Sequence, residues 1–130
     1  MINYIPEMQK NGFDKVTIKH LLQMTSGIKF NESYVNPFGQ AAAFYYGTNI
    51  RKYTIGIKLK AEPGTSFNYQ SGNTQLLGLV LERALKDKTL TQYLQEKLWT
   101  PLGMEYDGSW SLDRKDDGME KTFCCLNTTA

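Results

Sequence analysis

The sequence has little of what several classes of protein require. It contains one histidine and two cysteines among 130 residues. No apolar run approaches the roughly 20 residues that a membrane-spanning helix needs. The 15 basic and 13 acidic side chains are interspersed, so no positively charged surface for nucleic acid is expected. We therefore expect neither a membrane span nor a nucleic-acid partner.

The few soft metal ligands lack the spacing of a metal site. Cys124 and Cys125 are adjacent, and no histidine lies near them. Neighbouring cysteines cannot close an ordinary disulfide loop with each other, so we expect one buried and one exposed side chain on a strand. His20 has no Cys, Asp or Glu at ligand spacing, which favours a structural role. We expect no metal and no cofactor.

Length and composition fit a single domain, residues 1–130. The hydrophobic share of 41% and the charged share of 22% are typical of an ordinary globular protein. The first residues do not resemble a signal peptide, and we expect that the parent protein begins further upstream. These residues therefore leave the compartment undecided.

Capping residues and helical periodicity predict a mostly helical chain. Thr17, Asn49 and Thr89 are the expected N-caps, and T-x-x-Q at Thr89 is a capping box. Helices are expected over Thr17 to Gly27, Gln40 to Tyr46, Asn49 to Ile57, Gly72 or Asn73 to Lys86, and from Thr89 until Pro101 and Gly103 stop the last one. The expected core includes Leu21, Leu22, Leu77, Val80, Leu81, Leu94 and Leu98.

A small β-hairpin is expected near the C-terminus. Ser109 to Leu112 and Met119 to Leu126 have strand patterns, separated by the polar turn Asp113 to Gly118. The fold class is thus α+β, mostly α with a C-terminal hairpin. The pair Tyr45-Tyr46 fits the core better than the lining of a cleft, although both interpretations are open.

The most informative stretch of the sequence runs from Glu62 to Leu79 and reads E-P-G-T-S-F-N-Y-Q-S-G-N-T-Q-L-L-G-L. Phe67 and Tyr69 alternate with polar residues, and helical spacing begins at Thr74. Tyr69 therefore sits at a strand-to-helix junction, where side chains and backbone N–H groups can face a ligand. A solvated loop with no ligand is the alternative interpretation.

Three ordered segments resemble the serine β-lactamase-like hydrolases. Thr17 to Ile28 is similar to the H-L-L-x-M-T-S-G segment of that family. Pro63-Gly64, Phe67, Tyr69 and Leu76-Leu77-Gly78 match its P-G-x-x-F-x-Y segment and the following helix, and Leu98 to Met104 matches P-L-G-M. The family includes class C β-lactamases, D-alanyl-D-alanine peptidases, esterases and 6-aminohexanoate-dimer hydrolases. The resemblance implies the helical lobe of the β-lactamase/transpeptidase-like fold.

The resemblance also implies site residues. Tyr69-Gln70-Ser71 matches the Y-x-N motif with Ser in the third place, which makes Tyr69 the catalytic candidate. Ser71 and Asn73 are the substrate-binding candidates, because Ser71-Gly72-Asn73 also satisfies the S-x-N form. In this family the Tyr shares proton transfer with the Lys of an S-x-x-K motif.

Two motifs of the family are missing from these residues. No Ser precedes Thr17, and Ser26-Gly27-Ile28-Lys29 is a decoy for S-x-x-K, because Gly27 ends the helix that would align Ser and Lys. The final K-T-G or H-x-G strand does not occur either. We therefore expect part of a larger hydrolase domain, inactive when alone.

The resemblance implies a bacterial serine hydrolase, periplasmic or cytoplasmic, acting on small-molecule amides or esters through an acyl-enzyme. These residues would supply the wall that carries Tyr69, and the rest of the parent domain would be their partner. A non-catalytic binding or scaffold module on the same fold is the alternative. S-x-x-K upstream and K-T-G or H-x-G downstream in the reading frame would favour the enzyme.

Overall fold

The computed structural model describes residues 1–129 and consists mainly of short helices. Two 3-10 turns, Pro6–Asn11 and Phe13–Lys15, come first. The helices are α1 (Ile18–Leu22), α2 (Gln40–Tyr46), α3 (Ile50–Ile55), α4 (Ser71–Leu85) and α5 (Leu90–Leu94), which continues into a π-helical turn, Gln95–Trp99. The strands are β1 (Ile28–Lys29), β2 (Lys58–Leu59), β3 (Ser109–Trp110) and β4 (Leu126–Asn127). The predicted fold class, mostly α with small antiparallel sheets, is confirmed.

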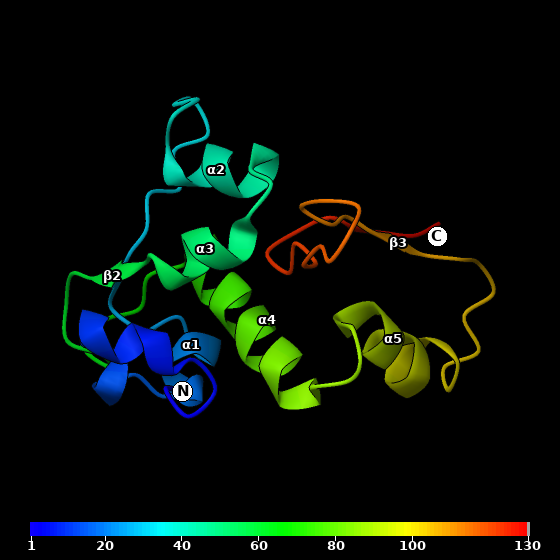
Figure 1. Ribbon diagram of the computed structural model, residues 1–130, viewed down its shortest axis with the longest axis horizontal. Helices are drawn as coiled ribbons and strands as arrows, with labels where there is room; N and C mark the ends of the chain where they lie inside the picture. The colour runs from blue at the N-terminus through cyan, green and yellow to red at the C-terminus, as the bar shows by residue number, and fades with distance from the viewer. Residues whose placement is uncertain (130) are drawn as a thin grey trace.

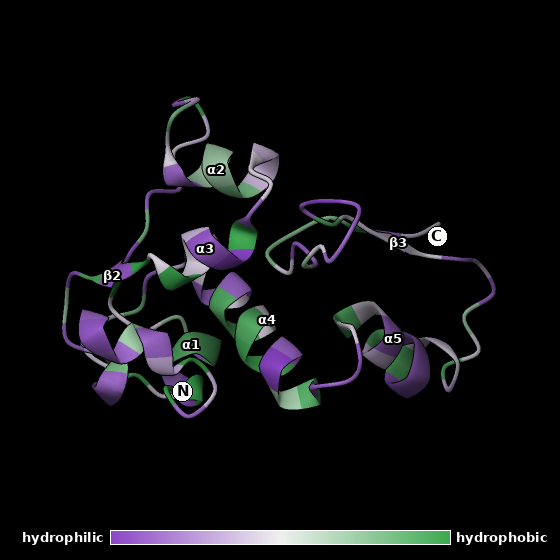
Figure 2. Cartoon of the chain, viewed as in Figure 1, coloured by the Kyte–Doolittle hydropathy of each residue, from purple (hydrophilic) through white to green (hydrophobic). Residues whose placement is uncertain are grey.

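Helix α4 is the central element, and α1, α3 and α5 all contact it (Figure 1). The N-terminal turns and α1 lie on one side of it, and α5 lies on the other. Strand β1 pairs with β2, and β3 pairs with β4, both antiparallel. Hydrophobic and hydrophilic residues alternate along α4 and α5, as expected of helices with one buried side (Figure 2). None of the helices within residues 1–129 is long and apolar enough to cross a bilayer.

The predicted N-caps are confirmed. Thr17 Oγ1 accepts a hydrogen bond from the His20 backbone N–H at 3.1 Å, and the Thr17 N–H donates to His20 Nδ1 at 3.3 Å. Asn49 Oδ1 accepts from the Lys52 N–H, and Thr89 forms the expected capping box with Gln92. His20 is therefore part of a helix cap, which bears out its structural role.

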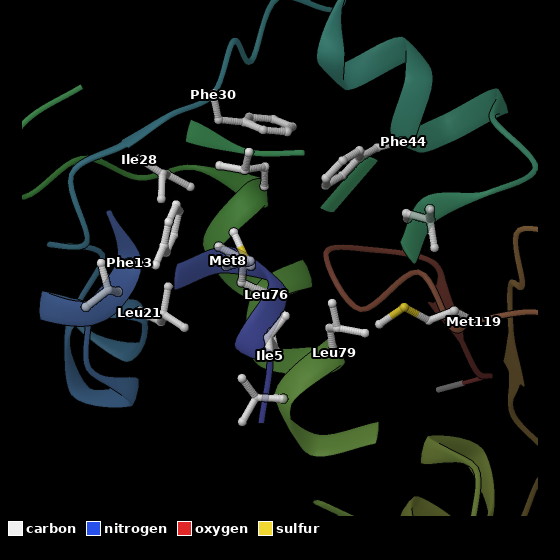
Figure 3. Close-up of a cluster of buried hydrophobic side chains, with 14 residues drawn as sticks. Ile5, Met8, Phe13, Leu21, Ile28, Phe30, Phe44, Leu76, Leu79 and Met119 are labelled. Carbon is white, nitrogen blue, oxygen red and sulfur yellow. The ribbon is translucent and has the colours of Figure 1, made fainter. Parts of the chain in front are cut away.

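The main core lies where α4 meets the N-terminal turns, α1 and β1 (Figure 3). Fully buried side chains include Phe13, Leu21, Phe44, Leu76 and Leu79. The rings of Phe30 and Phe44 pack against each other in a tilted arrangement, with centroids 4.8 Å apart. This contact joins the start of the β1–α2 loop to α2. This packing fixes the loop that leads to α2 against the first turn of α4.

The predicted core is right for some leucines and wrong for others. Leu21 and Val80 are buried, and Leu77 and Leu94 are half-buried. Leu22, Leu81 and Leu98 are 65%, 40% and 52% exposed. These leucines do lie on helices, as the spacing predicts, but no other element among residues 1–129 covers them. Tyr46, also predicted as core, is exposed, whereas Tyr45 packs against Phe123.

Two of the uncovered leucines, Leu81 and Leu98, border an apolar cavity of about 300 Å³ between α4 and α5. Leu77, Leu94 and Trp110 also line it. We call these five residues and their cavity the α4–α5 apolar cavity.

Helix α1 is shorter than predicted, because the backbone leaves the helix after Leu22. Gly27 has φ +72°, in the left-handed region that favours glycine. Its carbonyl oxygen accepts hydrogen bonds from the N–H groups of Lys60 and Ala61 at 2.9 and 3.2 Å. A Cβ at this position would lie 2.3 Å from the Ala61 carbonyl oxygen. Only glycine therefore lets the segment after β2 pass so close to the T-S-G turn.

The predicted hairpin is correct in pairing but wrong in extent. Ser109 pairs with Asn127, Trp110 pairs with Leu126, and Leu112 forms an isolated bridge with Glu120. Between these pairs, the buried carboxylate of Asp113 accepts hydrogen bonds from the N–H groups of Ile50 and Met119, at 2.7 and 2.9 Å. Through these two hydrogen bonds the Asp113 carboxylate joins the turn to α3, and the strands are shorter than predicted.

The cysteines differ from the expectation. A disulfide joins Cys124 to Cys125, and both residues are half-buried, with neither fully buried nor fully exposed. The pair precedes β4, and Phe123 beside it contacts Phe44 and Tyr45 of α2, with ring centroids 5.4 and 5.2 Å apart.

Candidate active site

Tyr69 lies immediately before α4, with its side chain 67% exposed. It borders an open groove of about 490 Å³. The other lining residues are Lys29, Phe30, Asn31, Glu32, Gln40, Lys60, Asn68 and Gln70. The hydroxyl has no hydrogen-bond partner within residues 1–129. From the sequence we expect Tyr69 at the exposed mouth of a groove between the Thr17–Gly27 segment and the Asn73–Lys86 helix. Tyr69 is indeed exposed, but residues of the Lys29–Glu32 segment and Gln40 line its groove, and no residue of the two expected segments does.

Two anchored neighbours hold Tyr69 at this position. The Asn68 N–H donates to the Met24 carbonyl oxygen at 2.8 Å. Gln70, only 4% exposed, donates from Nε2 to the Phe30 carbonyl oxygen at 2.7 Å. These hydrogen bonds anchor the backbone on both sides of Tyr69, whose own side chain is exposed. The phenol therefore stands at the solvent edge on a well-held backbone.

Ser71 begins α4 and faces Glu32. Its backbone N–H donates to Glu32 Oε1, and its hydroxyl donates to Glu32 Oε2 at 3.1 Å. The first N–H groups of a helix have no partner within the helix and favour a nearby negative charge. Glu32, from the loop after β1, thus caps α4. No local sequence pattern indicates this cap, because Glu32 lies far from Ser71 along the chain.

Tyr34 completes this cluster by donating from its hydroxyl to Glu32 Oε2 at 3.0 Å. The Ser71 hydroxyl lowers the pKa of Tyr34, but partial desolvation and the Glu32 carboxylate outweigh that effect and raise the pKa above its ordinary value. The Glu32 carboxylate therefore accepts from three donors on two separate segments. Tyr34 stays a neutral donor at ordinary pH.

Asn73 lies inside the protein, 1% exposed. Its Oδ1 accepts a hydrogen bond from Ser26 Oγ, and its Nδ2 has no partner among the described residues. Ser26 is equally buried, and Lys29 belongs to β1 instead of a helix with Ser26. The geometry agrees with the decoy interpretation of Ser26-Gly27-Ile28-Lys29.

The structure thus separates the three predicted site residues. Tyr69 faces the groove, Ser71 turns toward Glu32 at the edge of the interior, and Asn73 points into the core. Two lysines, Lys29 and Lys60, share the groove with the phenol. A phenol beside amines can pass a proton between a bound molecule and its surroundings. No cluster of three or more His, Cys, Asp or Glu side chains that could hold a metal ion is found among residues 1–129.

Comparison with known proteins assigns the family. The sequence model of the Beta-lactamase family matches residues 2–118. The 6-aminohexanoate-dimer hydrolase of Paenarthrobacter ureafaciens is 26% identical over 125 residues, which are 88% of this chain and 32% of that protein. Protein flp of Staphylococcus aureus strain MW2 is 30% identical over 105 residues, 77% of this chain and 20% of that protein.

A solved structure has the same fold. A proposed 6-aminohexanoate-dimer hydrolase from Bacillus anthracis superposes with a TM-score of 0.81 at 25% identity, over 99% of this chain and 37% of that one. The chain therefore spans about a third or less of the length of these relatives. Since the family model covers most of residues 1–130, this chain belongs to the Beta-lactamase family of hydrolase-fold proteins.

Proposed function

We propose that this chain supplies one wall of the active site of a serine hydrolase, which cleaves amide or ester bonds of small molecules through an acyl-enzyme. The observation that carries the proposal is the placement of Tyr69. The exposed phenol of Tyr69 borders a groove, and its two sequence neighbours, Asn68 and Gln70, are anchored by hydrogen bonds. Helix α4, which corresponds to the helix after the tyrosine in the family motif, begins at Ser71. The name of the Paenarthrobacter relative, 6-aminohexanoate-dimer hydrolase, supports the proposal of a hydrolase.

Tyr69 is the proposed proton-transfer residue. Acyl transfer requires a nucleophile, a group that takes its proton, and donors for the oxyanion. A tyrosine can relay a proton if its hydroxyl reaches the reacting atoms, and the Tyr69 hydroxyl is free to do so from the groove edge. The nucleophile and the oxyanion donors are proposed to come from other residues of the whole protein.

Ser71 and Asn73 have different proposed roles. Ser71 lies two residues after Tyr69 in sequence, and its hydroxyl can hydrogen-bond a substrate or the amine partner of the nucleophile by exchanging with Glu32. The buried position of Asn73 instead favours an indirect role, in which its bond with Ser26 fixes the first turn of α4. Asn73 is therefore proposed as a positioning residue for the substrate-binding wall.

The test is a pair of tyrosine variants in the protein encoded by the complete reading frame. Tyr69→Phe should lower kcat by about 10²- to 10⁴-fold, the usual scale for removal of a general acid–base group. Tyr46→Phe is the matched control, because Tyr46 is 86% exposed and does not border the groove. A chromogenic cephalosporin, a p-nitrophenyl ester and the linear 6-aminohexanoate dimer serve as substrates.

Two results would contradict the proposal. Equal activity of Tyr69→Phe and Tyr46→Phe would remove Tyr69 from the chemistry. Absence of turnover and of covalent labelling in the complete protein would instead favour a non-catalytic module. The 130-residue chain alone is expected to show no turnover, because deletion of a nucleophile abolishes covalent catalysis whatever else is retained.

A further inference from the structure

We propose that Cys124 and Cys125 form a reversible thiol–disulfide site, whose oxidation state sets the packing of Phe123 and Trp110. The disulfide joins two neighbouring residues, and both are half-buried, so neither residue is enclosed in the core. The site stands apart from the Tyr69 groove, and it does not depend on the proposed hydrolase function.

A bond between neighbours is poorly suited to hold a fold together. A disulfide stabilises a protein mainly by closing a loop in the unfolded chain, and this benefit grows with loop length. The bond between Cys124 and Cys125 closes the shortest loop that a chain allows. Its effect is therefore local, on the backbone of these two residues and on the groups bound to them.

The local backbone is held in an unusual state. Cys125 has φ +71°, which residues with a side chain seldom adopt. Its carbonyl oxygen accepts from the Ser111 N–H at 3.1 Å, and the Cys124 carbonyl oxygen accepts from Trp110 Nε1 at 3.2 Å. Reduction opens the ring and lets Cys125 return to negative φ. We expect the Cys125 carbonyl group to turn with this change. Trp110 Nε1 should then lose its bond to the Cys124 carbonyl oxygen and keep the one to the Lys121 carbonyl oxygen, which is 3.2 Å away.

Phe123, which precedes the cysteine pair, contacts α2, and α2 in turn contacts the cluster formed by Glu32, Tyr34 and Ser71. Phe123 packs on Phe44 and Tyr45, and the Tyr45 ring lies 5.9 Å from the Tyr34 ring, centroid to centroid. Tyr34 binds Glu32, which caps α4 at Ser71. A change at Cys124–Cys125 therefore has a continuous path of packed rings and hydrogen bonds to the first turn of α4.

The chemical step is exchange with a low-molecular-weight disulfide such as oxidised glutathione. One cysteine thiolate attacks a sulfur atom of that disulfide, forms a mixed disulfide and releases one thiolate of the reagent. The second cysteine thiolate attacks the protein sulfur of the mixed disulfide, forms the Cys124–Cys125 bond and releases the second thiolate. The two protons lost by the cysteines end on two reagent thiols. Excess reduced glutathione drives the reverse reaction.

The experiment equilibrates the 130-residue chain in buffers with graded ratios of reduced to oxidised glutathione. Intact-mass spectrometry measures the fraction that has lost two hydrogen atoms, after acid quenching. A Trp99→Phe background leaves Trp110 as the sole indole, and its emission is recorded in the same buffers. We expect a reversible intramolecular disulfide, and a Trp110 emission change with the same midpoint as the mass change.

Amide hydrogen exchange at Ser71 tests whether the oxidation state of the cysteine pair affects the first turn of α4. The Ser71 amide should exchange hydrogen faster in the reduced chain than in the oxidised chain. The double variant Cys124→Ser/Cys125→Ser is the control, and neither its emission nor its Ser71 exchange should respond to glutathione. Circular dichroism establishes that the variants are folded.

The proposal is overturned if glutathione yields only mixed disulfides or linked dimers. It is also overturned if Trp110 emission is identical in the reduced and oxidised chains. An equal emission change in the cysteine-free variant would show that the reagent acts elsewhere. Unchanged Ser71 exchange would exclude the path to α4.

Discussion

Ser26 donates a hydrogen bond to Asn73 inside the protein, and this bond fastens the T-S-G turn to the first turn of α4. Both residues belong to segments that resemble family motifs, and each is 1% exposed. The contact gives the two polar residues a structural role, because each binds the other inside the protein. Ser26 is bound to a structural partner and is closed to any substrate in the groove.

Ser26→Ala should lower the free energy of unfolding by about 1–3 kcal/mol, because it leaves the buried Asn73 Oδ1 without a donor. Urea denaturation of the 130-residue chain measures the loss. Ser66→Ala is the control, since Ser66 is exposed, and it should change little. Labelling of Ser26 by a fluorescent phosphonate probe would contradict its structural assignment.

Glu32→Ala should destabilise the chain by about 0.5–2 kcal/mol, the usual range for loss of a helix cap. Glu32→Gln should cost less, because the amide oxygen can still accept from the Ser71 N–H. Hydrogen exchange at Ser71 should accelerate in both variants. Glu62→Gln is the matched control, since Glu62 makes only an exposed ion pair with Lys15 among the described residues. Equal effects at the two sites would contradict a capping role for Glu32.

Gly78→Ala should destabilise the chain by about 1–3 kcal/mol through overpacking. The new Cβ would lie 2.3 Å from Thr122 Oγ1 and 2.8 Å from Thr122 Cβ. An alanine normally favours a helix over glycine, so a loss would identify the contact as its cause. Gly56→Ala is the control, because its Cβ would meet backbone oxygens no closer than 3.3 Å. A gain in stability at Gly78 would refute the close contact with Thr122.

Acid should weaken the contact between Glu7 and Arg83. A hydrogen bond from Arg83 lowers the pKa of Glu7 below 4.5, and the Glu7 backbone N–H adds to this effect. A carboxylate with a depressed pKa stabilises the fold above its unfolded pKa, and this stability is lost as pH falls through the folded pKa. The Tm difference between the wild type and Glu7→Gln should therefore be largest near pH 7 and shrink below about pH 4.

The Glu7 effect should also be modest and weaker in salt, because both side chains are partly exposed. Glu105→Gln serves as the control, since Glu105 is exposed and belongs to none of the ion pairs of residues 1–129. A Tm difference for Glu7→Gln that grows in acid would reverse the predicted sign.

The sequence could predict features whose causes are local. Thr17, Asn49 and Thr89 cap helices because each lies three residues from the N–H group that it accepts, so a short pattern suffices. The sequence could not show that Glu32 caps α4 or that Asn73 meets Ser26, because those contacts join distant segments.

Periodicity also has a limit that the leucines illustrate. It states which residues share one side of a helix, but not whether another element covers that side. Val80 of α4 belongs to the buried core, whereas Leu81 of α4 and Leu98 are not covered by residues 1–129. The same α4 helix therefore gave both correct and incorrect core predictions.

The α4–α5 apolar cavity has a practical consequence for anyone who studies this chain in solution. Environment-sensitive dyes become fluorescent when they enter apolar cavities, and bright dye emission is often taken as a sign of a loosely packed state. Here the folded chain offers such dyes an apolar cavity lined by residues that include Leu81 and Leu98. Dye emission would therefore be high before any heating, and backbone circular dichroism is the sounder measure of whether this chain is folded.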